Sequence, residues 1–166
     1  MESLLARVMA TVLGLIALAG AAYYMSYANE SSKVNMMVVN VAQLVTEARA
    51  QYAMSPTGYS TFTTANISQL ASNKVIPSRL MLNGSAVDVW GNLISLNPVS
   101  SNNNFQFQIT FGGANIPLSA CEQLATSLGG YVDMTIGSQD MGNQTPDAIA
   151  ALNACNNSTQ FTLTYL

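Results

Sequence analysis

The sequence contains no histidine and few charged side chains. Charged residues make up 8% of the 166 residues, against about 25% in ordinary soluble domains. Without histidine, the Ser–His and Cys–His nucleophile pairs and most zinc sites are excluded, so we expect no enzyme, no metal and no cofactor. The formal net charge is −3, and the only basic residues beyond residue 53 are Lys74 and Arg79. Because there is no basic patch, we expect no direct binding of nucleic acid.

The acidic residues beyond residue 53 are spread along the chain rather than clustered. They are Asp88, Glu122, Asp133, Asp140 and Asp147. Asp133 falls on a predicted strand and Asp140 in the loop after it, so a fold that brings two carboxylates together would use this pair. We favour the simpler interpretation, in which all five are solvated surface charges.

A run without a charge occupies residues 8–25, and a one-sided helical pattern follows it with no turn signal between them. The run is at the lower limit of what spans a bilayer. The later pattern has an apolar stripe at spacings of three and four, with Asn40 outside it; its members are Val34, Val38, Val41, Val45, Ala48 and Tyr52, widened by Met37 and Leu44. Ser55-Pro56 and Gly58 stop it.

These patterns predict one helix of about 50 residues, near 75 Å long. We divide the chain into a helical part, residues 1–53, and a globular head, residues 54–166. Within the helix, residues 1–25 form an apolar half that projects from the head, and residues 26–53 form an amphipathic half that lies on it.

The head shows both helical and strand patterns, which predicts an α+β fold. The predicted elements are a short helix at Asn66–Ser72, a hairpin of Val87–Trp90 and Leu93–Leu96, strands at Phe105–Phe111, Tyr131–Ile136 and Phe161–Tyr165, a helix opened by a Ser119–Glu122 capping box and running to about Leu128, and a helix begun by Thr145-Pro146-Asp147 and running to about Ala154.

Cys121 and Cys155 are the only cysteines. In a domain behind a membrane segment, such a pair indicates a disulfide in an oxidising compartment. The loop that it closes has about 35 residues and is worth about 3–4 kcal/mol in the chain-entropy model. The alternative is a pair of buried free thiols in a cytosolic protein.

Several short features occur in a characteristic order. They are the apolar run to Tyr23-Tyr24, the polar step Ser26–Lys33, the amphipathic stripe, Ile76-Pro77, Trp90-Gly91-Asn92, Ala120–Ala125, Cys155 and the final strand. In this order the chain resembles a mature type IV pilin of the type IVb class, similar to bundle-forming pilins and to thin-pilus pilins of conjugative plasmids. The resemblance covers nearly the whole chain.

The resemblance implies a pilin fold, in which the long N-terminal helix packs on an antiparallel sheet and one disulfide bounds a C-terminal region. It implies a helical filament of identical subunits outside the cell, held in the inner membrane before assembly. It also implies a pilus assembly machinery and a prepilin peptidase that removes a leader before Met1. Pilins of this class carry glutamate at position five, thought to pair with a neighbour's N-terminal amine, whereas this chain has Leu5.

Two charges lie near the apolar end, where an unpaired charge costs several kcal/mol. Glu2 and Arg7 are five residues apart, about 140° around a helix, so they do not pair well within one chain. We predict that Glu2 of one subunit pairs with Arg7 or the Met1 amine of another. The alternative is that both side chains reach a membrane interface.

Gly14 and Gly20 lie inside the apolar run. Glycine costs about 1 kcal/mol against alanine in a helix interior. We favour a role in close helix–helix approach, together with Ala17 and Ala21. The alternative is a place where the helix stretches in a filament.

Two functional hypotheses follow. The first is a major pilin that polymerises and serves conjugation, aggregation or adhesion, with surface contacts set by residues 122–154 and by a loop near 97–104, and with a recipient cell or cell-surface receptor as partner. The second is a minor pilin, a pseudopilin or a single-span tethered binding domain. A tether needs a flexible linker, and no such linker precedes Pro56.

Overall fold

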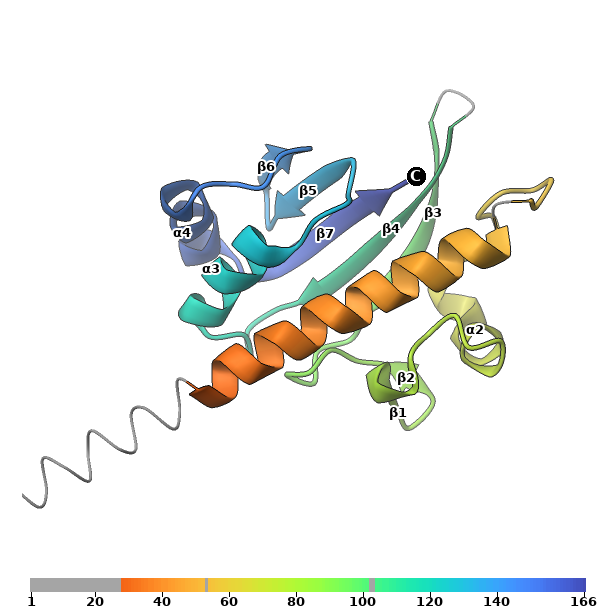
Figure 1. Cartoon of the computed structure of the whole chain (residues 1–166), viewed down its shortest axis with the longest axis horizontal. Coiled ribbons are helices and arrows are strands. Elements are labelled where there is room, and N and C mark those ends of the chain that lie inside the picture. Colours follow the sequence, from red (N-terminus) through yellow and green to blue (C-terminus); the bar gives the residue numbers. More distant parts are fainter. Residues whose placement is uncertain (1–27, 53, 102–103) are drawn as a thin grey trace, which may run out of the picture. The chain divides into compact units, whose positions relative to one another are not determined.

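The computed structural model describes residues 28–52, 54–101 and 104–166. The chain divides into two compact units, Met1–Ser32 and Lys33–Leu166. Of the first unit only residues 28–32 are described, and they are helical. The helix is continuous over residues 28–52 and is called the spine helix below (Figure 1). Among the described residues no helix combines the length and apolarity needed to cross a membrane; the apolar run 8–25 lies outside them.

The second unit is built on a five-stranded antiparallel sheet in the order β3-β4-β7-β5-β6. Its strands are β3 (Ser95–Ser101), β4 (Asn104–Gly112), β5 (Asp133–Ile136), β6 (Gln139–Gly142) and β7 (Gln160–Tyr165). The terminal strand β7 lies in the middle of the sheet, because it pairs with β4 on one side and β5 on the other. Strand β7 therefore joins the β3–β4 pair to the β5–β6 pair.

The spine helix packs on this sheet (Figure 1), and the two share one hydrophobic core. Alternation along β4 and β7 places one set of side chains in the core, including Phe107, Ile109, Phe161 and Leu163. The Phe111 and Phe161 rings stack across the strand pair with centroids 5.3 Å apart. The predicted α+β architecture, with a long helix on an antiparallel sheet, is confirmed.

The segment after the spine helix contains two short 3-10 turns, Thr64–Asn66 and Ser78–Leu80, the helix α2 (Ile67–Ser72) and a small hairpin of β1 (Met81–Leu82) and β2 (Ser85–Ala86). The hairpin turns at Asn83 and Gly84, which both have positive φ, as a two-residue type I′ turn requires. Aromatic side chains anchor the segment to the sheet: Tyr59 and Phe62 have ring centroids 4.5 and 4.8 Å from Phe107. The predicted helix at Asn66–Ser72 is confirmed, with Ile67 and Leu70 buried.

The predicted hairpin of Val87–Trp90 and Leu93–Leu96 is confirmed only in part. The chain does reverse at Gly91-Asn92, with one antiparallel bridge between Val87 and Leu93 and a hydrogen bond from Asp88 N to Asn92 O. It forms no pair of strands there, and from Ser95 onward the chain pairs with β4 over seven residue pairs. The region near 97–104 is therefore not one loop, since residues 97–101 belong to β3. Strand β6 was also missed by the sequence patterns.

Both predicted helix caps are displaced. Helix α3 (Leu118–Ser127) begins directly after Pro117, whose carbonyl accepts from Cys121 N, so Ser119 lies inside the first turn and makes no cap. Helix α4 (Ala148–Asn157) is capped by Asp147 rather than Thr145, because the Asp147 Oδ1 accepts from Ala150 N at 2.7 Å. It also runs beyond Ala154.

Candidate subunit interface

The spine helix has a buried face and an uncharged exposed face. The predicted stripe is buried at Val34, Met37, Val41, Leu44, Val45 and Ala48, and half-buried at Val38 and Tyr52. On the opposite side the exposed residues from 35 to 46 are Asn35, Met36, Val39, Ala42, Gln43 and Thr46. An exposed helix face in a soluble protein normally carries charged residues. The uncharged exposed face, with Val39 62% exposed, is therefore a candidate contact surface.

Asn40 is buried, contrary to the prediction. It was placed outside the stripe, yet it is 2% exposed, and its Nδ2 has no hydrogen-bond partner among the described residues. The helical pattern by itself does not signal this burial.

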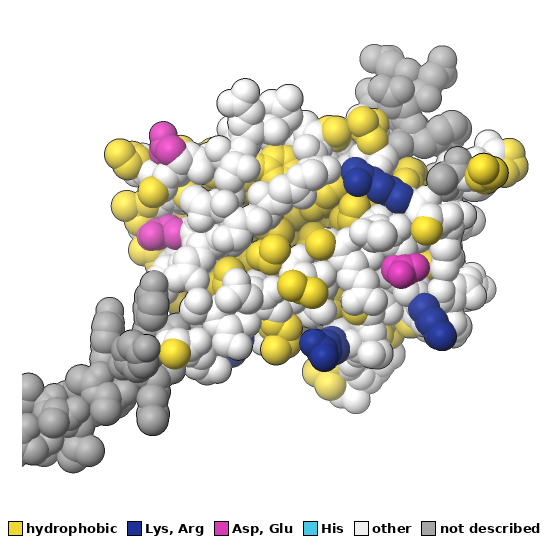
Figure 2. Space-filling view, viewed as in Figure 1, with side chains coloured by type: hydrophobic (Ala, Val, Ile, Leu, Met, Phe, Trp, Pro, Cys, Tyr) yellow, Lys and Arg dark blue, Asp and Glu magenta, His cyan; other side chains and the backbone are white. Residues whose placement is uncertain are grey.

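A groove runs beside the uncharged exposed face. It has a volume of 190 Å³ and lies between the spine helix, the Leu128–Gly130 segment and the end of β7. Its lining is mixed: apolar side chains such as Val41, Val45 and Leu128 alternate with the polar side chains of Thr46 and Arg49 and with the backbone of Gly129 and Gly130. In the view of Figure 2, apolar side chains form a band between the spine helix and the sheet.

Arg49 closes one end of the groove. Its Nε donates to Leu166 O at 2.8 Å and its Nη2 donates to Gly130 O at 3.3 Å. The guanidinium also lies 5.8 Å from the centroid of the Tyr165 ring, within the range of a cation–π contact. Burial raises the pKa of Tyr165, and Arg49 lowers it in part. The Tyr165 phenol therefore stays neutral at physiological pH. Through its two hydrogen bonds, Arg49 connects the spine helix to Gly130, in the segment after α3, and to Leu166, directly after β7.

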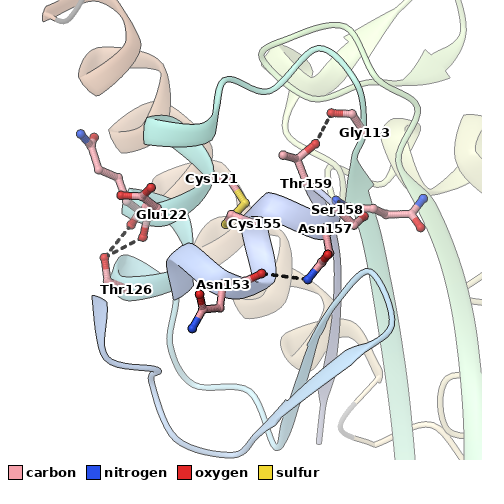
Figure 3. Close-up of a disulfide and its surroundings, with 11 residues drawn as sticks. Gly113, Cys121, Glu122, Thr126, Asn153, Cys155, Asn157, Ser158 and Thr159 are labelled. Carbon is pink, nitrogen blue, oxygen red and sulfur yellow. Dashed lines mark hydrogen bonds between the residues drawn. A yellow bond between two sulfur atoms is a disulfide. The ribbon is translucent and has the colours of Figure 1, made fainter. Parts of the chain in front are cut away.

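The disulfide joins α3 to α4 (Figure 3). Cys121 and Cys155 are bonded, with Cα atoms 5.9 Å apart and a sequence separation of 34. Both cysteines are buried, which confirms the predicted pairing and excludes the free-thiol alternative. The outward side of α4 exposes Ile149 (72%) and Leu152 (37%) among Asn residues.

Asp88 was predicted as a solvated charge, and this prediction is wrong. The residue is 4% exposed. Its Oδ1 accepts from Trp90 N (2.9 Å) and Asn92 N (2.8 Å), and its Oδ2 accepts from Asn92 Nδ2 (2.9 Å) and Gly112 N (3.2 Å). Because Gly112 ends β4, the carboxylate fastens the turn at 88–92 to the sheet. A buried carboxylate is stable only with such donors.

Asp133 and Asp140 come together at the surface, where Asp140 is exposed and Asp133 is half-buried. The β5–β6 pairing places Thr135 opposite Asp140. Burial raises the pKa of Asp133, and the charge of Asp140 and a side-chain hydrogen bond with Asp140 raise it further. No group of three metal-ligand side chains occurs in the part of the chain that the structure describes, and nothing further indicates a ligand at this pair.

Both edges of the sheet are protected against pairing with another strand. On β3, Leu96 N donates to Thr64 Oγ1 (2.8 Å) and the Thr64 hydroxyl donates to Leu96 O (3.1 Å), so the outward backbone groups of Leu96 are occupied. Pro98, two residues on, shares this edge and has no N–H. On the other edge, β6 is four residues long, irregularly paired and charged at Asp140. Such devices prevent strand addition.

The sequence matches the family model described as PilS N terminal over residues 31–166. The chain belongs to the PilS N-terminal family. Its fold is similar to that in the crystal structure of TcpA, a type IV pilin from Vibrio cholerae El Tor biotype, with a TM-score of 0.54, 15% identity, and coverage of 81% of this chain and 98% of that chain. No curated protein matches the sequence. Membership of the PilS N-terminal family and the shared fold confirm the resemblance to type IVb pilins, which are structural proteins.

The predicted assembly residues lie outside the described residues. They are Met1, Glu2, Leu5, Arg7, Gly14 and Gly20. Their roles stay predictions. Of the predicted site residues, the described chain contains only the cysteine pair, and it brings that pair together as expected.

Proposed function

We propose that this chain is a major pilin, which polymerises into an extracellular filament used for attachment between cells or to a surface. The observation that carries the proposal is the uncharged exposed face of the spine helix. A face with Val39 and Ala42 exposed and no charge between residues 35 and 46 is suited to contact with other subunits. The family and the pilin fold support the coarser role of a pilus subunit.

The protected sheet edges also support assembly through the helix rather than through the sheet. A subunit that polymerised by strand addition would keep a free edge. Here Thr64 occupies the β3 edge and Pro98 removes a donor from it. We infer that subunits assemble through the helical part, residues 1–53, and that residues 54–166 form the head. Before assembly, the apolar half of the helix is held in the inner membrane.

The proposal includes the prepilin peptidase and the assembly machinery as partners, and a recipient cell or surface receptor as the target. It places Glu2 of one subunit against Arg7 or the Met1 amine of another. Exposed residues in the region 122–154, such as Ile149, would set contacts at the filament surface. The alternative is a minor pilin, a pseudopilin or a tethered monomer.

Shearing of cells that produce the full chain tests the proposal. We expect abundant filaments in the sheared fraction, with this chain as their main component by mass spectrometry and a processed N-terminal peptide. A chain that stays in the membrane as a monomer would support the tethered alternative. A trace amount within filaments of another protein would support a minor pilin.

A further inference from the structure

We propose that Asn83 is a site of spontaneous deamidation, where the side-chain amide at an exposed hairpin tip is converted to a carboxylate. The proposal does not depend on the proposed function, because the reaction requires only the chain and water. Asn83-Gly84 is the only place in the sequence where asparagine precedes glycine. Glycine has no Cβ, so its nitrogen reaches the preceding side chain with the least hindrance.

The reaction uses the backbone nitrogen of Gly84 as the nucleophile. This nitrogen loses its proton and attacks Cγ of Asn83, so that a bond between nitrogen and Cγ forms. The bond from Cγ to Nδ2 breaks, and the amide leaves as ammonia after it takes up a proton. Water then opens the five-membered ring: addition at Cγ gives aspartate, and addition at the backbone carbonyl carbon gives isoaspartate. No electrons are transferred, and water is the only co-reactant.

The fold leaves both reacting groups accessible. Asn83 and Gly84 are the two central residues of the turn between β1 and β2, and both are exposed. The hydrogen bonds of such a turn join the flanking residues, here Leu82 and Ser85, so they do not use the Gly84 N–H. Among the described residues the Asn83 side chain has no hydrogen-bond partner. A Cβ built on Gly84 would meet nothing within 4 Å, which leaves room for the ring.

The hairpin tip can open without unfolding of the head. Strands β1 and β2 form a sheet of their own with two residue pairs, separate from the five-stranded sheet. A two-stranded hairpin is at best marginally stable by itself. Ring closure requires backbone rotation at Asn83, and local opening of the tip permits it. Leu80 and Ala86, on either side of the tip, are buried in the core and hold the ends of the hairpin in place.

Asn157 provides a comparison within the same chain. It is also exposed and precedes the small residue Ser158, but helix α4 holds both groups that would react. The Asn157 Nδ2 donates to Asn153 O at 3.0 Å (Figure 3), and the Ser158 N donates to Ala154 O at 3.1 Å. The end of the helix must therefore open before Asn157 can react. Exposure alone does not separate the two sites, whereas the hydrogen bonds do.

The two products affect the hairpin differently. Aspartate before glycine favours the same type I′ turn as asparagine does, so this product keeps the register and adds a negative charge to a chain whose net charge is −3. Isoaspartate adds a carbon atom to the main chain. A two-residue turn fixes the register of its strands, so this product disturbs the pairing of Leu82 with Ser85.

Ageing of the purified full chain in detergent tests the proposal. The solvent is water enriched in heavy oxygen, because each deamidated residue then retains one solvent oxygen. After ageing, the disulfide is reduced, the chain is digested with chymotrypsin, and mass spectrometry measures the conversion at Asn83 and Asn157. Electron-transfer fragmentation separates aspartate from isoaspartate. The matched variant is Gly84→Asn, since asparagine tolerates positive φ but its side chain hinders the attack. A parallel sample is aged in urea.

We expect Asn83 to convert at least about tenfold faster than Asn157 in the folded chain, and Gly84→Asn to slow conversion at residue 83 by about tenfold. The rate at Asn83 should rise with pH, because the attacking nitrogen must lose its proton. In urea the rate at Asn157 should rise, because the helix that holds it is lost.

No conversion at Asn83 in the folded chain, or equal rates at Asn83 and Asn157 there, would overturn the proposal. A rate at residue 83 that Gly84→Asn leaves unchanged would also overturn it, because the Gly84 nitrogen would then not be the nucleophile. The comparison of Asn83 with Asn157 uses the unsubstituted chain, so it decides the matter even where the variant does not fold.

Discussion

Asp88 shows how one residue connects distant parts of this fold. Its two carboxylate oxygens accept four hydrogen bonds from Trp90, Asn92 and Gly112. Three of these bonds are local to the turn, and the fourth crosses to the end of β4. In the sequence Asp88 is indistinguishable from the exposed acids, because its donors come mainly from the backbone.

We predict that Asp88→Asn lowers the free energy of unfolding by about 2–4 kcal/mol, because the amide group would face N–H donors and leave at least one of them unpaired. Urea unfolding of the purified full chain measures the loss. The matched control is Asp147→Asn, which we expect to be nearly neutral since asparagine caps helices as well as aspartate does. Equal losses in the two variants would contradict the role of Asp88.

Asp133 gives a pH-dependent prediction. Burial, the Asp140 charge and a hydrogen bond with Asp140 raise its pKa in the folded chain, and a backbone hydrogen bond from Met134 lowers it in part. A carboxyl with a raised folded pKa stabilises the fold fully below its unfolded pKa, and this contribution is lost as the pH rises through the folded pKa.

Asp133→Asn should therefore raise the melting temperature near neutral pH, by about 1–3 °C for a solvent-screened pair. Under acid conditions the parent carboxyl is protonated and the difference should vanish. Thermal unfolding of both chains across the pH range checks this. A constant difference at every pH would show that the effect is not due to ionisation.

At the scale of elements, the edge strand β3 depends on a side chain from a different segment. Thr64 lies in the 3-10 turn Thr64–Asn66, and its hydroxyl both accepts from and donates to the backbone of Leu96. Together with Pro98 it closes an edge that would otherwise offer free backbone groups to another chain.

We predict that Thr64→Val costs about 1–2 kcal/mol of stability, since it removes two hydrogen bonds and keeps the shape of the side chain. Combined with Pro98→Thr, it should also produce aggregates that bind a β-sheet dye, measured with light scattering at matched concentration. Thr64→Ser with the same Pro98 substitution is the control and should stay soluble. Aggregation of the control to the same extent would show that Pro98 alone protects the edge.

At the scale of the whole molecule, the chain has few charges to direct assembly. With 8% charged residues and an uncharged exposed helix face, we predict that contacts between subunits are made mainly by apolar and uncharged polar side chains. The charges of Glu2 and Arg7 near the apolar end are then important for assembly, because an unpaired charge in a dry filament core costs several kcal/mol.

We predict that Glu2→Arg and Arg7→Glu each lower the yield of sheared filaments by at least about tenfold, which corresponds to a loss of about 1.4 kcal/mol per contact. The double swap should restore much of the yield if the two charges pair between subunits. Arg79→Glu reverses an exposed charge on the head and should assemble normally. Normal assembly of both single variants would favour the membrane-interface alternative.

The elements with strict periodicity were predictable. The stripe from Val34 to Ala48, strand β4 and strand β7 were all identified, because their alternation of buried and exposed residues is local. The cysteine pair was predictable from number and context. Strand β3 was not, because Pro98 and its polar neighbours give no strand pattern and its pairing is supplied by β4.

The sequence alone determined that a long helix carries one apolar stripe, that two cysteines are available for a disulfide, and that the chemistry of histidine is absent. These properties depend on which residue types are present and on the spacing of residues within one segment. The tertiary structure decided the burial of Asp88 and Asn40, the meeting of Asp133 with Asp140, and the groove beside Arg49. Each of these depends on groups that lie far apart in the chain or on backbone atoms, so no local pattern records them.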